Sequence, residues 1–156
     1  MFKRPVDEIC VGNGSAELIR IYCQIVTGKT CRIDIPTFGE YELSAELAGK
    51  QVVEYPHTAD IRFICNPNNP TGTMIERDEM QYIIDEAQRN GQQLFIDEAF
   101  MALAETDESV TDIQKENLFV LRSLTKSYAV PGLRFGFGFG PAELIEKSRP
   151  HELPGQ

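Results

Sequence analysis

Short apolar segments alternate with amphipathic helical patterns, and this alternation restricts the fold more than any other feature of the sequence. Seven segments are predicted strands: Glu8–Gly12, Cys31–Ile35, Gln51–Tyr55, Ile61–Cys65, Gln93–Asp97, Leu118–Arg122 and Arg134–Gly140. Apolar residues at helical spacing predict helices from an N-cap at Ser15 to Gly28, over Tyr41–Ala48 and over Arg77–Arg89. Strands separated by helices predict an α/β fold built on a largely parallel sheet.

The composition excludes several classes of protein. With 156 residues, 42% of them hydrophobic and 25% charged, the chain has the make-up of one globular domain rather than of a disordered segment. Its 24 acidic residues outnumber its 15 basic residues, which argues against non-specific binding to nucleic acid. No apolar run approaches the ~18 residues that a membrane helix needs. We therefore expect neither a nucleic-acid partner nor a membrane association.

The cysteines do not form a metal-binding pattern. Cys10, Cys23, Cys31 and Cys65 include no C-x-x-C pair, and the chain has only two histidines. A zinc site, or any other metal site, is therefore not expected. Free cysteine behaves as a small apolar residue, so the sequence predicts buried, reduced thiols in a cytoplasmic protein.

Two polar, turn-forming motifs follow predicted strands. Gly12-Asn13-Gly14-Ser15-Ala16 leads from the first strand into a helix, whose N-terminus favours an anion such as phosphate. Asn66–Gly72 contains three asparagines and two prolines, which specify a rigid loop with amide side chains at the sheet edge. Ligands of parallel sheets bind at the carboxyl ends of the strands, so both motifs are candidates for a site.

Two further strands end on charged side chains. Asp97 directly follows a strongly apolar run, and a buried acid needs a cation or hydrogen-bond donors. Ser123, Thr125 and Lys126 follow the next strand, and Arg134 comes eight positions after the lysine. A lysine in such a cleft can attack a carbonyl carbon. Together with a phosphate site, these groups match the needs of pyridoxal 5'-phosphate, which has an aldehyde, a pyridine nitrogen and a phosphate.

Four segments of the chain resemble the class I/II aminotransferase family of fold-type I pyridoxal-phosphate enzymes. The segments are G-N-G-S-A-E-L-I, C-N-P-N-N-P-T-G-T, F-I-D-E-A-F and V-L-R-S-L-T-K-S-Y-A-V-P-G-L-R-F-G. The resemblance implies a three-layer fold with a mostly parallel seven-stranded sheet and helices on both faces. It also implies that residues 1–156 form a single cofactor-binding large domain without the family's small domain, from a parent family of homodimers.

The resemblance also assigns roles to individual residues. Lys126 would bind the cofactor covalently and later move the α-proton, and Asp97 would pair with the pyridinium nitrogen. Asn69 would donate to the phenolate oxygen, and Phe38 would stack on the ring. The phosphate would be held by Ser15, Ala16, Ser123, Thr125 and Arg134. Many relatives have tyrosine at the position of Phe100, another cofactor-contacting position.

The resemblance is nearest to the branch that contains threonine-phosphate decarboxylase and histidinol-phosphate aminotransferase. It implies a phosphorylated amino acid or amine as the substrate. Phe100 favours a decarboxylase of cobalamin side-chain synthesis, and the alternative is a transaminase of histidine biosynthesis. Because the family's N-terminal segment and small domain are not matched, a third hypothesis is an inactive fragment that only folds or binds the cofactor or a partner chain.

Overall fold

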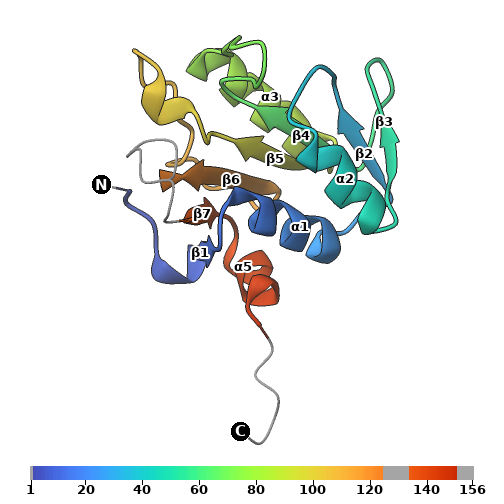
Figure 1. The fold of residues 1–156 in the computed structure, drawn as a ribbon, viewed down its shortest axis with the longest axis horizontal. Coiled ribbons are helices and arrows are strands. Elements are labelled where there is room, and N and C mark those ends of the chain that lie inside the picture. Colours follow the sequence, from blue (N-terminus) through green and yellow to red (C-terminus); the bar gives the residue numbers. More distant parts are fainter. Residues whose placement is uncertain (1, 125–133, 151–156) are drawn as a thin grey trace, which may run out of the picture.

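The predicted strands assemble into one seven-stranded sheet. The computed structural model describes residues 2–124 and 134–150. The strand order is β1-β7-β6-β5-β4-β2-β3, and β7 runs in the opposite direction to the other six strands (Figure 1). The strands are β1 (Ile9–Gly12), β2 (Thr30–Ile33), β3 (Gln51–Val53), β4 (Ile61–Cys65), β5 (Gln93–Asp97), β6 (Leu118–Ser123) and β7 (Gly136–Phe139). The expectation of a mostly parallel, seven-stranded α/β sheet is confirmed.

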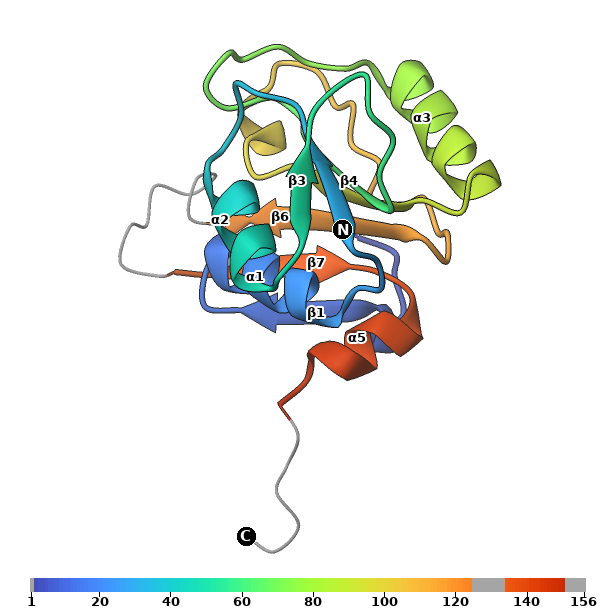
Figure 2. The same cartoon turned by 90° about the vertical axis from the view of Figure 1, so that its right-hand side faces the viewer.

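Helices cover both faces of this sheet. They are α1 (Ser15–Ile25), α2 (Glu40–Leu47), α3 (Arg77–Arg89) and α5 (Ala142–Ser148), with short 3-10 turns η1 (Val6–Glu8) and η2 (Met101–Leu103). Helices α1, α2 and α5 bury their apolar residues against one face, and α3 against the other (Figure 2). The three-layer expectation is therefore confirmed. Within the described ranges, none of the helices has the length and apolar character needed to cross a membrane.

Two local predictions are corrected by the structure, and one helix was not predicted. Ser15 is the first residue of α1 rather than its N-cap, because Gly14 takes that place with a φ of 88° that glycine adopts without strain. Helix α1 ends at Ile25, before Gly28, because Val26 is already extended. Helix α5 is not among the predicted elements; it is a short element that starts after Pro141.

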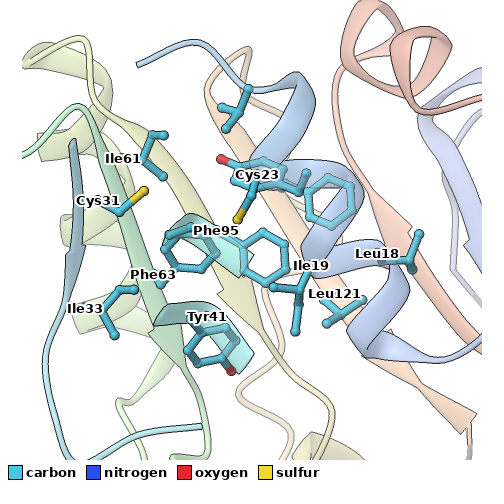
Figure 3. Close-up of a cluster of buried hydrophobic side chains, with 14 of the residues drawn as sticks. Leu18, Ile19, Cys23, Cys31, Ile33, Tyr41, Ile61, Phe63, Phe95 and Leu121 are labelled. Carbon is cyan, nitrogen blue, oxygen red and sulfur yellow. The ribbon is translucent and has the colours of Figure 1, made fainter. Parts of the chain in front are cut away.

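The larger of the two apolar clusters is rich in aromatic rings. It lies between the sheet and helices α1, α2 and α5, and Figure 3 shows part of it. Phe95 occupies its centre, with the rings of Phe63, Tyr22 and Phe119 at 5.1, 4.8 and 5.2 Å. All four cysteines are free and buried, as predicted, and burial raises the pKa of Cys23 to about 12.

The strand directions place the polar motifs along one edge. Strands β1, β4, β5 and β6 are mutually parallel, so their carboxyl ends share this edge. Because β7 is antiparallel, its amino end and the preceding Arg134 lie at the same edge. The motifs at Gly12–Ala16, Asn66–Gly72, Asp97 and Ser123 therefore converge, although they are far apart in the sequence.

Gly138 of β7 is a position where a side chain has no room. A β-carbon added there would lie 2.2 Å from Cζ of Phe119, whose ring is packed within the aromatic cluster. Gly138→Ala is expected to lower the free energy of unfolding, measured with urea, by about 1–3 kcal/mol because it overpacks the core. Gly39→Ala is the control, since its β-carbon would meet no atom within 4 Å and its φ is −66°. Equal effects of the two substitutions would contradict the packing argument.

Candidate active site

A small pocket lies at the carboxyl edge of the sheet. Its volume is about 50 Å³, and its lining residues are Ser15, Phe38, Cys65, Asn69, Asp97, Ala99 and Phe100. Five of these seven are candidate cofactor residues from the sequence, and they come from four separate segments of the chain. A larger pocket of about 580 Å³ adjoins it, because Asn69 and Phe100 line both.

Asp97 is a buried carboxylate at the end of β5, with only 2% of its surface exposed. Its Oδ1 accepts a hydrogen bond from the Ala99 N–H at 2.8 Å, and its Oδ2 accepts one from the Tyr41 hydroxyl at 2.6 Å. Burial raises the pKa of Asp97, and these two donors oppose the increase. No cation among the described residues forms an ion pair with it. A carboxylate of this kind is suited to a cationic group bound in the pocket.

The asparagines of the loop after β4 have different tasks. Asn66 is buried, and its side-chain amide bonds to both backbone groups of Ile75, donating to the carbonyl at 3.0 Å and accepting from the N–H at 2.7 Å. This pair closes the loop. Of the three asparagines, Asn69 lines the small pocket.

Asn68 links this loop to the segment before α2. Its amide donates to the carbonyl of Pro36 at 2.9 Å and its oxygen accepts from the Thr37 hydroxyl at 2.8 Å. These bonds fix the segment that carries Phe38 beside the loop that carries Asn69. Two walls of the pocket are therefore joined directly.

The turn at the start of α1 lies at the same edge of the sheet and is suited to an anion. The first N–H groups of a helix have no partner within it and carry the positive end of its dipole. A β-carbon added at Gly14 would lie 3.6 Å from Nε of Arg134, so the guanidinium packs against this turn. A β-carbon at Gly136 would lie 2.9 Å from the Ser15 N, so only glycine lets β7 pass so closely. Ser15, Ala16 and Arg134 thus form a surface suited to phosphate.

The remaining predicted residues lie beside the pocket or outside the described chain. Ser123 is buried at the end of β6 and pairs in register with Gly136, next to the α1 turn, but it does not line the pocket. Thr125 and Lys126 fall outside the described residues.

Sequence reasoning missed three residues of the site, namely Tyr41, Cys65 and Ala99. The sequence places Tyr41 only at the start of a predicted helix, and Cys65 only among the buried thiols. One signal was present for Tyr41, since a tyrosine buried in a core usually needs a partner for its hydroxyl. Ala99 contributes a backbone N–H, which leaves no mark in the sequence.

Comparison with known proteins agrees with the site that this geometry describes. Residues 2–152 match the family described as aminotransferase class I and II. The chain belongs to this family. Enzymes of the class I and II aminotransferase family depend on pyridoxal phosphate, and the resemblance seen in the sequence is thereby confirmed.

Individual relatives divide between two enzyme names. The chain is 34% identical to a histidinol-phosphate aminotransferase of Aeromonas salmonicida, over 89% of this chain and 44% of that protein. The structure of an L-threonine-O-3-phosphate decarboxylase from Porphyromonas gingivalis superposes with a TM-score of 0.85 at 25% identity, covering 94% of this chain and 51% of that one. The structure of a histidinol-phosphate aminotransferase from Clostridium acetobutylicum superposes with a TM-score of 0.81 at 28% identity, covering 90% of this chain and 47% of that one. The chain therefore spans about half the length of these relatives.

Proposed function

We propose that this chain is the cofactor-binding part of a pyridoxal-phosphate-dependent enzyme that acts on a phosphorylated amino acid or amine. The observation that carries the proposal is Asp97, a buried carboxylate that faces a pocket and has no cation partner within the described residues. The pyridinium nitrogen of the cofactor would supply the missing positive charge. The turn at Ser15, with Arg134 beside it, would supply a phosphate site at the same edge of the sheet.

Each residue of the site has a distinct task in this proposal. When bound, pyridoxal phosphate supplies a ring that withdraws electrons from the bond to be broken in the substrate. Asp97 would hold the proton on the ring nitrogen, and Asn69 would donate to the ring oxygen. Phe38 and Phe100 would pack against the ring and exclude water. The phosphate would be held by Ser15, Ala16, Ser123, Thr125 and Arg134, and Lys126 would bind the aldehyde and move the proton at the α-carbon.

Within this class, we favour a threonine-phosphate decarboxylase-like reaction. Phe100 lines the pocket where many relatives have tyrosine, and the decarboxylase structure superposes well. In that case the enzyme would serve cobalamin side-chain synthesis. A histidinol-phosphate aminotransferase-like reaction is the second candidate, because a relative of that name is at least as similar in sequence as the decarboxylase relative. A cytoplasmic homodimer is part of the proposal, and an inactive fragment is its remaining alternative.

The visible spectrum of the protein mixed with pyridoxal phosphate tests the cofactor site. We expect a visible band in the wild type that Lys126→Ala abolishes, because the lysine amine forms the covalent bond to the aldehyde. Lys147→Ala is the control, since Lys147 is an exposed lysine paired with Glu143. Matching spectra of the wild type and Lys126→Ala would refute the proposed site.

Two assays then separate the reactions. Release of carbon dioxide from threonine phosphate would identify the decarboxylase, and amino transfer from histidinol phosphate to 2-oxoglutarate would identify the transaminase. A band without turnover of either substrate would identify the chain as a cofactor-binding fragment.

A further inference from the structure

We propose that Tyr41 is a positioning residue for Asp97, and that its hydroxyl holds the carboxylate in the orientation in which it meets the ring nitrogen of the bound cofactor. The hydrogen bond from the Tyr41 hydroxyl to Oδ2 is 2.6 Å long and joins α2 to the end of β5. The inference rests on the proposed function, since it deepens the role given there to Asp97.

Tyr41 is itself held rigidly. Only 1% of its surface is exposed, and its ring stacks on Phe63 with centroids 5.4 Å apart and an angle of 23°. Phe38 meets the ring edge-on at 5.6 Å. In Figure 3 the Tyr41 ring lies at one end of the labelled cluster, with its hydroxyl directed away from Phe63. Packing in the core therefore fixes the position of the hydroxyl.

The hydroxyl can act only as a protonated donor towards Asp97. Burial, and then the neighbouring Asp97 charge, raise the pKa of Tyr41 well above its ordinary value, so the phenol stays neutral. The other titratable group at this point is Cys65 of β4, whose pKa burial raises to about 11, so this thiol stays neutral as well. Among the residues that the structure describes, Tyr41 is thus the side chain that donates to Asp97, and the Ala99 N–H is the backbone donor.

Two donors on Asp97 leave room for a third. A carboxylate has about four lone-pair sites, and Tyr41 and Ala99 occupy one on each oxygen. The remaining sites can accept a proton donor from the pocket, which Asp97 lines. Tyr41 also favours the ionised form, because hydrogen bonds to a charged group stabilise it. Loss of the hydroxyl is therefore expected to make Asp97 harder to ionise and free to turn.

Tyr41→Phe tests the inference, and Tyr22→Phe is a matched control. Tyr22 is 2% exposed and belongs to the same cluster, but its hydroxyl has no hydrogen-bond partner within the described part of the chain. Carboxyl ¹³C NMR of the cofactor-free protein, with Asp97→Asn to assign the signal, gives the pKa of Asp97. We expect Tyr41→Phe to raise that pKa by about one to two pH units and Tyr22→Phe to leave it unchanged.

A second readout uses the cofactor. With pyridoxal phosphate, we expect Tyr41→Phe to weaken binding about tenfold or more and to move the pH midpoint of the visible band, while Tyr22→Phe keeps the wild-type profile. An unchanged Asp97 pKa in Tyr41→Phe would overturn the inference even if the cofactor binds. If the wild type binds no cofactor, the proposed function fails, and the carboxyl titration still decides whether Tyr41 controls Asp97.

Discussion

Asp97→Asn is expected to separate cofactor binding from folding. Loss of a buried charge partner costs about 2–5 kcal/mol of binding free energy, so affinity for pyridoxal phosphate should fall roughly 30-fold or more. The cofactor-free protein should be no less stable, because the asparagine amide can bond to the Tyr41 hydroxyl and the Ala99 N–H, the two groups that contact Asp97. Titration with the cofactor and urea unfolding without it measure the two effects.

The difference in folding stability between Asp97→Asn and the wild type should change with pH in a defined direction. The pKa of Asp97 is raised in the folded protein, mainly by burial, so the folded state favours the protonated carboxyl. The contribution of Asp97 to stability is therefore full below its unfolded pKa of about 3.9 and is lost as the pH rises through the raised value. The free energy of unfolding of Asp97→Asn should therefore equal that of the wild type at low pH and exceed it towards neutral pH.

A control and a contrary result complete the test. Asp112→Asn removes the charge of an exposed acid, 70% accessible at its side chain, and should leave cofactor affinity unchanged. Wild-type affinity in Asp97→Asn would show that Asp97 does not meet the cofactor nitrogen.

Arg122→Met is expected to lower the free energy of unfolding by about 3–5 kcal/mol, a large part of the 5–15 kcal/mol typical of a domain. The Glu98 side chain is fully buried and accepts bonds from Arg122 at 3.1 Å, the Ser109 hydroxyl at 2.7 Å and the Val110 N–H at 2.7 Å. Burial raises the pKa of Glu98, and Ser109, Val110 and Arg122 oppose the increase. Without the arginine, the carboxylate would remain buried without a countercharge.

Urea unfolding of two further variants makes this prediction specific. The double variant Arg122→Met/Glu98→Gln should recover most of the loss, because it removes both charges. Lys147→Met breaks an exposed pair with Glu143 and should cost about 1 kcal/mol or less. A loss in Arg122→Met no larger than that in Lys147→Met would contradict the role of the buried pair.

The architecture of the site could be predicted because it follows from strand direction. Once the strands ending at Cys65, Asp97 and Ser123 are known to be parallel, their following polar residues must share one edge. Apolar runs identify such buried strands well. The sequence alone therefore predicts that Asp97, Asn69 and the turn at Ser15 lie close together.

The features that could not be predicted have both long-range and local causes. The hydrogen bond between Tyr41 and Asp97 joins residues 56 positions apart, and helical periodicity assigns a buried tyrosine to the core whether or not it has a partner. The N-cap was misplaced because serine is a common cap, whereas here the positive φ of Gly14 sets the turn. Helix α5 has only seven residues, too few for a clear period.

The pairing of β1 with β7 has a consequence for the order in which parts of the sheet can assemble during synthesis. Ile9 lies opposite Phe139, so β1 leaves the ribosome long before β7, the strand with which it pairs. The turn after β1 is packed against Gly136 of that same late strand. The end of the site suited to phosphate therefore cannot be complete until β7 has been synthesised and has packed against this turn.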